Sequence, residues 1–572
     1  MLTRGRLVFV AAGLAMLSGC ATTGAQQVPN PADTIIAGAH ILTMDGSKPE
    51  AVAVRGEIIA ATGSRASVMK LRGPDTRVVE LGERALVPGF IDTHSHVTMV
   101  GRMSGYANLS SPPVGPVTDM ASLQQHLRDH IAAKQLPPGE WAVGYGYDDS
   151  LLAENRHPTR DDLDAVSSDH PIAILHVSGH LSVANSAALA AAGVTAASKD
   201  PPGGHIRRRP GSDEPNGVLE ETAAYTVLGQ FYSRGPATPI PGILAALDSY
   251  ASEGFTTVQD GAANAADVAA IKGYVSQSGK ALPVDLVAFP AYGNLPAEEK
   301  ASCSVPVSMD YTGGFRIGGT KFVLDGSPQG RTAWLSKPYV LPPDGKGADY
   351  VAYPTVKPEQ FMIDLSRCIA AKVPVLAHAN GDQAIQLLVD ATAGAIGEAR
   401  PDHRTVIIHA QLMREDQLDR AKDLGLIPSF YAVHPYFWGD WHRKIFGEER
   451  ASRISPIRSA IRRDLPYTIH NDAPVVPPMA LRLISIAVNR TTRSGHVLGP
   501  EQRATPYEAL YAMTMGGAYQ YSEEASKGSI TPGKRADLVI LDADPLTADP
   551  AKIVDIKVME TIVRGQTVFR RD

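Results

Sequence analysis

Short apolar segments, separated by glycine and Asp/Gly turns, lie at both ends of the chain. The first segments are ADTIIAGAHILTM, AVAVRGEIIAATG and TRVVELGERALVPGF, and the last are SITPGKRADLVILDAD and VMETIVRGQTVFR. Segments of this length and composition are typical of small antiparallel strands. Because both ends share this pattern around a long middle, we predict that residues 33–84 and 526–572 build one composite β-sandwich domain.

Eight apolar runs alternate with helix-like stretches in the middle of the chain, residues 85–525. In chain order the runs are ALVPGFID, FTTVQD, VDLVAF, RIGGTKFVLD, VPVLAH, RTVIIH, LIPSFY and PYTIHND. Eight buried strands with intervening helices are typical of a (β/α)8 TIM barrel, an α/β fold. A doubly wound sheet is the competing arrangement, but no glycine-rich phosphate loop follows the first run.

An unusually long segment separates the first two runs. About 150 residues lie between them, far more than an ordinary connection from a strand to a helix. This insert, about residues 100–245, contains strand-like stretches of its own, WAVGYGYDDS and PIAILHVSGH. Because it follows the first strand, it leaves the barrel at the C-terminal face, where such barrels keep their active sites. We therefore expect the insert to form a lid over that face.

Polar residues stand at the ends of several predicted strands. They are His94 and His96 after the first run, Lys321 in the fourth, His378 in the fifth, His409 in the sixth and Asp472 in the eighth. An isolated His-x-His is more often a polar turn, but residues at these strand ends converge on one mouth of a barrel. Side chains alternate along a strand, so the two histidines of the first run point the same way. Neutral imidazoles and a carboxylate are ligands that zinc prefers, so the pattern predicts a divalent metal centre.

Several motifs resemble those of a known family. GFIDTHSHV, HANGD, IIHAQ, HNDAPV and GSITPGKRADLVILD resemble the amidohydrolase superfamily of metal-dependent hydrolases. HVSGH, ANSAAL, DPPGGHI, NGVLEE, KFVLDGSPQGRTA and HPYFWGD narrow the resemblance to amidohydrolase family 3, and it runs from about residue 33 to the C-terminus. The His-x-His alone is a weak signal, whereas the ordered set is strong.

The resemblance implies roles for the polar residues at the barrel mouth. His94 and His96 would bind the more buried metal ion, and His378 and His409 would bind a second ion if one is present. Asp472 would contact the metal, take a proton from the attacking water and pass it to the leaving nitrogen. Zinc is the expected ion, and whether one ion or two bind stays open.

The position of Lys321 has two interpretations. The resemblance implies a carboxylated lysine that bridges two metals, and a structural lysine paired with Asp325 or another acid is the alternative. Glu220 and Glu221 are reserve candidates for an anionic ligand. The acidic pair at 148–149 follows a Tyr/Gly stretch and represents either further ligands or, more simply, turn residues.

The insert and the seventh run add candidates for substrate binding. His176 and His180 lie four residues apart in HVSGH and would share a face in a helix, although a polar turn is an equal alternative. Glu221, in NGVLEE, is a further candidate from the insert. His434 and Trp438 follow the seventh run, and they either line the substrate pocket or belong to an aromatic core.

Composition restricts the partners and leaves the cysteines open. The formal charge is −6, from 54 basic and 60 acidic residues, so no basic excess is available to neutralise the phosphates of a nucleic acid. We expect a small-molecule substrate and no nucleic-acid partner, and homo-oligomerisation stays open. Cys303 and Cys368 are too few for a disulfide scaffold; their pairing stays open, and Cys368 is expected to be a buried apolar residue.

The first residues of the chain resemble an export signal. Two arginines precede the apolar run LVFVAAGLAML, which ends in LSGC, similar to a bacterial lipobox. We predict that residues 1–20 form a lipoprotein signal peptide, that Cys20 carries the lipid, and that residues 21–32 form a flexible tether. An ordinary signal peptide is the alternative. The lipoprotein would lie on the periplasmic face, and Ala21 favours the outer membrane.

The residues and the resemblance together predict a metal-dependent hydrolase that cleaves an amide-type C–N bond. An esterase or lactonase with the same metal centre is the first alternative, because the fold does not choose among these substrates. A surface lipoprotein that binds or regulates without turnover is the second alternative, and the complete set of candidate ligands argues against it.

Overall fold

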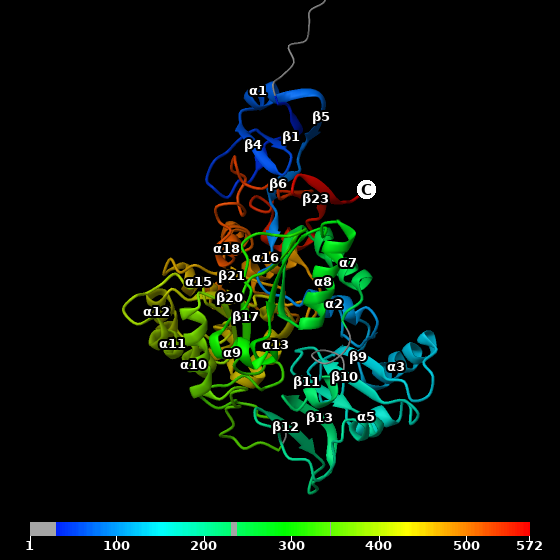
Figure 1. The fold of residues 1–572 in the computed structure, drawn as a ribbon. Coiled ribbons are helices and arrows are strands. Elements are labelled where there is room, and N and C mark those ends of the chain that lie inside the picture. Colours follow the sequence, from blue (N-terminus) through cyan, green and yellow to red (C-terminus); the bar gives the residue numbers. More distant parts are fainter. Residues whose placement is uncertain (1–29, 230–236, 344) are drawn as a thin grey trace, which may run out of the picture.

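The computed structural model describes residues 30–229, 237–343 and 345–572. A β-sandwich, a barrel and an α/β insert follow one another along the long axis of the molecule (Figure 1). The predicted signal peptide, its Cys20 and residues 21–29 of the tether lie outside the described residues. The last tether residue, Ala32, instead opens the first strand. Within the described parts, no helix is long and apolar enough to cross a membrane.

The sandwich contains two sheets. The first has the order β4-β3-β1-β5, with β1 (Ala32–Ala37), β3 (Ala51–Arg55), β4 (Ile58–Gly63) and β5 (Arg72–Glu80). The second has the order β2-β6-β22-β23-β24, with β2 (His40–Ile41), β6 (Ala85–Pro88), β22 (Leu538–Leu541), β23 (Val558–Val563) and β24 (Gln566–Arg570). Ile36 and Val52 of the first sheet share one core with Leu538 and Ile562 of the second. Both chain ends therefore build this unit, as the fold prediction requires.

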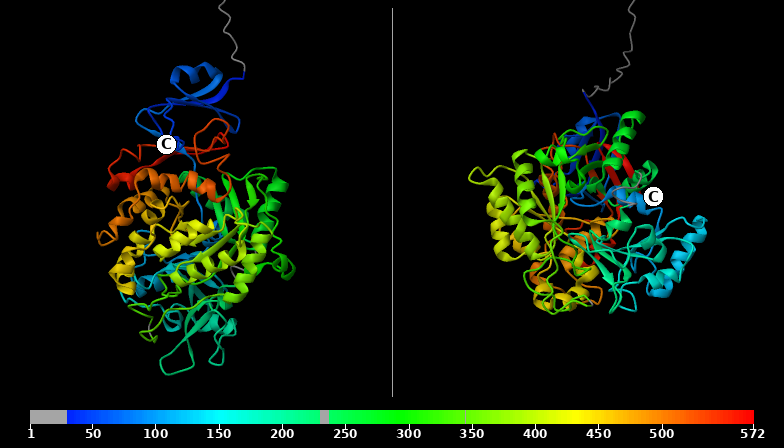
Figure 2. Two further views of the ribbon diagram at one scale, coloured as in Figure 1. Left: turned by 90° about the vertical axis from the view of Figure 1, so that its left-hand side faces the viewer. Right: turned by 60° about the horizontal axis from the view of Figure 1, so that its bottom comes forward.

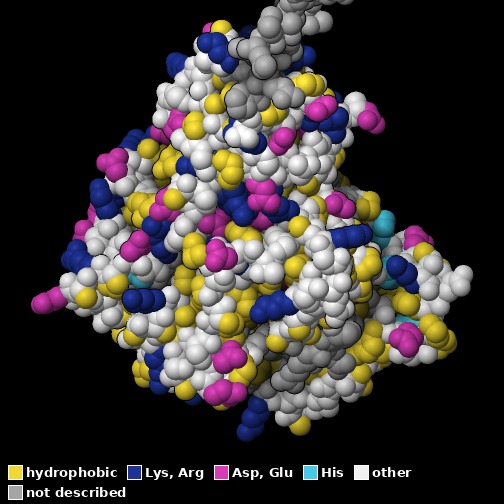
Figure 3. Space-filling model, turned by 45° about the horizontal axis from the view of Figure 1, so that its top comes forward, with side chains coloured by type: hydrophobic (Ala, Val, Ile, Leu, Met, Phe, Trp, Pro, Cys, Tyr) yellow, Lys and Arg dark blue, Asp and Glu magenta, His cyan; other side chains and the backbone are white. Residues whose placement is uncertain are grey.

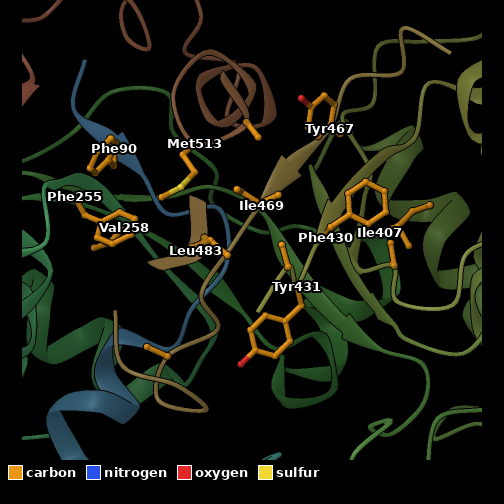
Figure 4. Close-up of a cluster of buried hydrophobic side chains, with 14 of the residues drawn as sticks. Phe90, Phe255, Val258, Ile407, Phe430, Tyr431, Tyr467, Ile469, Leu483 and Met513 are labelled. Carbon is orange, nitrogen blue, oxygen red and sulfur yellow. The ribbon is translucent and has the colours of Figure 1, made fainter. Parts of the chain in front are cut away.

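The eight predicted apolar runs form parallel strands. They are β7 (Phe90–Ile91), β14 (Phe255–Ala263), β15 (Asp285–Pro290), β16 (Phe315–Ile317) with β17 (Thr320–Val323), β18 (Val375–Ala379), β19 (Val406–His409), β20 (Ile427–Phe430) and β21 (Thr468–Ile469). They make two sheets, ordered β16-β15-β14-β7 and β17-β18-β19-β20-β21. Aromatic and aliphatic side chains of these strands pack together, with the Phe90 and Phe255 rings 6.2 Å apart (Figure 4).

Two junctions join the sheets into a barrel. At the first, β16 and β17 are halves of the fourth predicted strand, interrupted by Gly318 and Gly319. A Cβ atom at Gly319 would lie 2.1 Å from the carbonyl oxygen of Pro374, so only glycine permits this close approach. At the second, the amide of Asp472 donates to the carbonyl of His94 at 3.0 Å, just beyond the ends of β21 and β7.

The first predicted strand is wrong in one respect, because ALVPGFID does not form a single strand. Its first half is β6 of the sandwich, and its second half is β7 of the barrel. Gly89 stands between them, and an added Cβ atom would lie 2.2 Å from the Thr256 hydroxyl. The chain passes from one sheet to the other at this glycine, so an apolar pattern alone cannot reveal the break.

Helices surround the barrel (Figure 2). They include α2 (Val97–Met103), α7 (Ile240–Ser252), α8 (Ala265–Ser278), α9 (Ala297–Ser302), α10 (Pro358–Ala370), α11 (Asp382–Ile396), α12 (Glu415–Leu424), α13 (His434–Phe446), α14 (Glu448–Ser452), α15 (Ile457–Ile461), α16 (Ala480–Asn489), α17 (Pro506–Ala512) and α18 (Met515–Gln520). In α11, Ile385, Leu388 and Thr392 are buried at helical spacing, so one face packs against the barrel.

The insert forms its own six-stranded sheet, ordered β12-β13-β11-β10-β9-β8. Its strands are β8 (Ala107–Asn108), β9 (Ala142–Tyr147), β10 (Ile172–His176), β11 (Leu181–Ala184), β12 (Gly204–Arg208) and β13 (Pro215–Glu221), and its helices include α3 (Met120–Lys134) and α5 (Ser186–Ala191). His176 ends β10 and His180 precedes β11, so these histidines lie in a strand-turn-strand unit. The helical alternative for HVSGH is therefore wrong.

Cys303 and Cys368 form a disulfide between the end of α9 and α10. Both residues are fully buried. The expectation that Cys368 is buried is therefore confirmed, and the pairing that the sequence left open is a disulfide. The bond closes a loop with a sequence separation of 65 residues, which in the chain-entropy description stabilises the fold by about 4 kcal/mol.

The molecular surface carries charges of both signs. On the face shown in Figure 3, basic and acidic side chains are interspersed rather than gathered into a basic patch.

A buried group of charges connects the start of barrel strand β15 to the C-terminal segment of the chain. Asp285, which opens β15, accepts hydrogen bonds from Lys527 at 2.7 Å, from Arg535 at 2.8 Å and from Arg564. Burial alone would raise the pKa of the Asp285 carboxyl. Lys527, Arg564 and Arg535 together lower it by more, so the pKa lies below its ordinary value. The carboxylate therefore remains ionised and holds three cations.

We predict that Asp285→Ala lowers the free energy of unfolding by about 3–5 kcal/mol, because it removes the buried carboxylate that three cations share. The measurement is urea unfolding of both proteins. Because the folded-state pKa is lowered, the contribution is fully present above the unfolded-state pKa of about 4 and is lost as pH falls from there through the lower pKa of the folded protein. Asp248→Ala, at an exposed position in α7, is the control and changes stability by less than about 0.5 kcal/mol. Equal stability of the Asp285 and Asp248 variants would contradict the prediction.

Candidate metal centre

One cavity at the C-terminal mouth of the barrel brings together the six residues that the sequence marks as candidate ligands. They are His94, His96, Lys321, His378, His409 and Asp472. Each lies in a strand of the barrel or just after its end, so the parallel arrangement brings their side chains to the same mouth. Their convergence is a property of the fold, whereas their role as ligands stays a prediction.

His94, His96 and Asp472 form the first half of the site. The Oδ1 atom of Asp472 lies 3.6 Å from Nε2 of His94 and 3.3 Å from Nε2 of His96. This buried oxygen has no hydrogen-bond partner among the described residues. Zinc ligands at about 2.0–2.1 Å in tetrahedral geometry stand roughly 3.4 Å apart. The distances from Asp472 to the two imidazole nitrogens are therefore those expected between ligands of one shared cation.

Gln259, in β14, orients the first histidine. Its side-chain oxygen accepts a hydrogen bond from Nδ1 of His94 at 2.6 Å, and its amide donates to Tyr521 at 2.7 Å. Because Nδ1 carries the proton, the lone pair of Nε2 faces Asp472 and Lys321. Burial lowers the pKa of His94 well below its ordinary value, which keeps the imidazole neutral. Such an outer contact is typical of metal-binding histidines.

Lys321, His378 and His409 form the second half. The His378 and His409 rings are 4.6 Å apart, and Nζ of Lys321 lies 2.9 Å from Nε2 of His94. Burial lowers the pKa of Lys321 to about 7 and holds the pKa values of both histidines well below their ordinary range. Near pH 7 both histidines are therefore neutral and the lysine is partly neutral, so all three can serve as electron-pair donors.

The alternative pairing of Lys321 with Asp325 is not observed among the described residues. Asp325 instead accepts hydrogen bonds from the backbone amides of Trp334, Asn380 and Gly381, and it lies 3.2 Å from Nδ1 of His378. Asp325 therefore holds the loop after β18 through three backbone amides and contacts the Nδ1 side of the His378 ring.

The backbone is strained at two candidate ligands. His409 has φ 75° and Asp472 has φ 56°, in the left-handed region that side chains other than glycine rarely adopt. Each such conformation costs about 1–3 kcal/mol and persists where surrounding structure determines it. Both side chains line the cavity at the mouth, so the strain falls at the candidate site.

The insert contributes a histidine to the mouth. Nδ1 of His180 is 2.7 Å from the Glu221 carboxylate, and the His180 ring lies 4.8 Å from the His378 ring. Burial alone would lower the pKa of His180. The Glu221 carboxylate raises it by more, so the pKa lies above its ordinary value. His176 and His180 line the cavity, while Glu221 lies behind His180 and is not among the lining residues.

His434 and Trp438 lie in an aromatic core behind the cavity. They are one turn apart on α13, and neither is among the lining residues. His434 stacks on His442, with a nitrogen-to-nitrogen distance of 2.7 Å, and the Trp438 indole donates to Asp148 at 2.8 Å. Of the two interpretations left open by the sequence, the structure therefore has the aromatic core.

The rest of the cavity wall is mostly apolar. It includes Met99, Met103, Tyr145, Leu175, Val177, Tyr225, Val323, Pro474 and Val475, and no arginine is among the described lining residues. A neutral, apolar group of a substrate fits such a wall better than a carboxylate.

Sequence reasoning missed His470 and Gln259. His470 lies 3.1 Å from Nδ1 of His409 and stacks on Tyr431 at 5.2 Å. Its signal was available, because it stands two residues before Asp472 in TIHND. Gln259, in FTTVQD, is an ordinary polar residue at a strand end, and only the structure reveals its contact with His94.

Comparison with known proteins agrees with this architecture. Residues 77–569 match the amidohydrolase family. N-substituted formamide deformylase of Arthrobacter pascens is 27% identical over 557 residues, which cover 94% of this chain and 98% of that protein. An uncharacterized metal-dependent hydrolase from Pyrococcus horikoshii has a TM-score of 0.68 at 22% identity and covers 90% of this chain and 99% of its own. A similar hydrolase from Pyrococcus furiosus has a TM-score of 0.66. Because the family match spans most of the sequence, this chain belongs to the amidohydrolase family and is a metal-dependent hydrolase.

Proposed function

We propose that this hydrolase cleaves an amide-type C–N bond of a small, neutral substrate at the barrel mouth. The observation that carries the proposal is the buried Oδ1 of Asp472, which faces two imidazole nitrogens at 3.3 and 3.6 Å and has no hydrogen-bond partner among the described residues. The similarity to N-substituted formamide deformylase supports a substrate of the formamide or amide class.

Zinc is the proposed ion. His94, His96 and Asp472 would hold one ion, and His378 and His409, with Lys321, would hold a second. The donor set is nitrogen and oxygen, which zinc prefers. When bound, such an ion lowers the pKa of water towards ~7 and polarises a carbonyl group.

Asp472 is the proposed catalytic proton carrier. Burial alone would raise the pKa of this carboxyl group. His96, His470 and Lys321 together lower it by more, so the carboxylate is ionised at neutral pH. It would accept a proton from the attacking water and return it to the leaving nitrogen. His180, held by Glu221, would donate a hydrogen bond to the substrate from the opposite wall.

We also propose that Lys321 is carboxylated. Its Nζ has no ion-pair partner within 4.0 Å among the described residues, and an uncompensated buried ammonium is costly. Burial lowers its pKa to about 7, so the neutral amine that reacts with CO₂ is present at physiological pH. The resulting carbamate would supply two anionic oxygens between the histidine pairs. An unmodified lysine beside a single metal ion is the alternative.

Ester or lactone hydrolysis at the same centre remains the alternative activity. The apolar cavity wall accepts either substrate class, so matched panels of amides and esters distinguish them by kcat/KM. A binding protein without turnover is disfavoured, because the family and the assembled donor set both point to hydrolysis.

We propose that the protein is an exported lipoprotein anchored through Cys20 on the periplasmic side of the outer membrane. The sequence of the first 20 residues supports export. The buried disulfide adds support, because disulfides persist in oxidising compartments such as the periplasm.

We predict that Asp472→Asn lowers kcat by about 10²–10⁴-fold, because the amide cannot accept the proton. The measurement combines kcat on an N-substituted formamide with metal content by mass spectrometry. Asp390→Asn, an exposed position on α11, is the matched control and keeps full activity. Full turnover by the Asp472 variant with its metal bound would refute the proton-transfer role.

We predict that Lys321→Ala lowers kcat by at least about 100-fold, because it removes an anionic ligand worth several kcal/mol. Propionate, which can occupy the space and supply a carboxylate, should restore part of the activity. In wild-type protein equilibrated with ¹³C-bicarbonate, NMR should show a carbamate signal that the variant lacks. Absence of that signal in the active, metal-loaded wild type would favour the unmodified lysine.

A further inference from the structure

The insert contains a second group of buried metal-ligand side chains. Asp148 and Asp149 follow β9, His157 lies in the next loop, and His176 ends β10. Each is at least nine-tenths buried. The simpler interpretation of the acidic pair at 148–149 is confirmed, because both residues stand at the turn after β9, and in addition both are buried.

The donor atoms of this group converge on Asp149. Its Oδ1 lies 3.0 Å from Nε2 of His176, and its Oδ2 lies 3.4 Å from Nε2 of His157. One ligand atom each of Asp148, Asp149 and His176 lie within 4.8 Å of one another. Two imidazoles thus face one carboxylate from two sides, at separations that ligands of one ion adopt.

His157 provides an independent indication of a ligand. Its Nε2 is buried, faces the carboxylate of Asp149 and has no hydrogen-bond partner among the described residues. Its other nitrogen contacts the Tyr147 hydroxyl at 3.2 Å, as that of His176 contacts Ser178 at 2.8 Å. His157 is therefore oriented through Nδ1 and presents Nε2, which is the arrangement of a metal-binding histidine. The amide of Ser178 donates to Nδ1 of His176 at 3.2 Å, so Nε2 of His176 donates a proton to Asp149 at 3.0 Å, and a bound cation would take the place of that proton.

We propose that Asp149, His157 and His176 form a second metal site, within the insert, that binds a divalent first-row ion of the zinc class. Asp148 adjoins the site and accepts a hydrogen bond from Trp438 of the barrel helix α13. His176 and Ser178 also line the substrate cavity. An ion at this site would stabilise the cavity wall and the contact between the insert and the barrel. Its role would be structural and separate from the reaction at the barrel mouth.

Crystals of the wild-type, metal-loaded protein test the site directly. Anomalous difference maps on both sides of the zinc absorption edge locate each ion without any substitution. The expected result is a peak between His157, His176 and Asp149, in addition to peaks beside His94 and His96. Peaks at the barrel mouth alone, from protein purified with added zinc, would overturn the proposal.

Metal analysis of variants gives a second test. His157→Gln should lower zinc content by one equivalent per chain and leave the barrel ions in place, whereas His126→Gln, on helix α3 of the insert, should leave zinc content unchanged. His94→Gln should remove zinc from the barrel mouth and abolish activity, while it retains the insert equivalent. Unchanged zinc in folded His157→Gln would refute the insert site alone, and retained activity in His94→Gln would instead refute the proposed function.

Discussion

Closure of the barrel between its last and first strands is the constraint on which the site depends. The amide of Asp472 donates to His94 at 3.0 Å, and the amide of His96 donates to Ala473 at 2.8 Å. These two bonds connect segments from opposite ends of the barrel sequence and fix the register of the carboxylate against both imidazoles. The left-handed backbone at Asp472 is tolerable only because closure holds it on both sides.

The candidate ligands at the barrel mouth and those in the insert share one feature, which is a buried polar atom without a hydrogen-bond partner. In each group, a carboxylate stands between imidazoles and at least one donor atom, Asp472 Oδ1 or His157 Nε2, has no hydrogen-bond partner among the described residues. Burial holds the pKa values of His94 and His157 well below their ordinary range, so that they do not neutralise the carboxylates themselves. A cation would resolve this arrangement, because buried charges persist when they are paired or coordinated.

Much of the barrel could be predicted because strand periodicity and strand-end chemistry are local properties. The eight apolar runs and the polar residues that end them are readable in this way, and so is His470 in principle. The rest depends on contacts between distant segments. The break at Gly89 arises from a close approach to Thr256, the disulfide from packing of α9 against α10, and the position of Trp438 from its bond to Asp148. No local pattern encodes which distant surface a residue meets.

The division of labour between barrel and insert bears on how substrate choice is set. The barrel strands supply the candidate ligands, whereas Tyr145, Leu175 and Val177 of the insert supply part of the apolar wall, and His180 reaches the mouth from the same side. The insert packs around cores of its own, separate from that of the barrel. The insert thus contributes part of the cavity wall, while the barrel strands carry most of the candidate ligands.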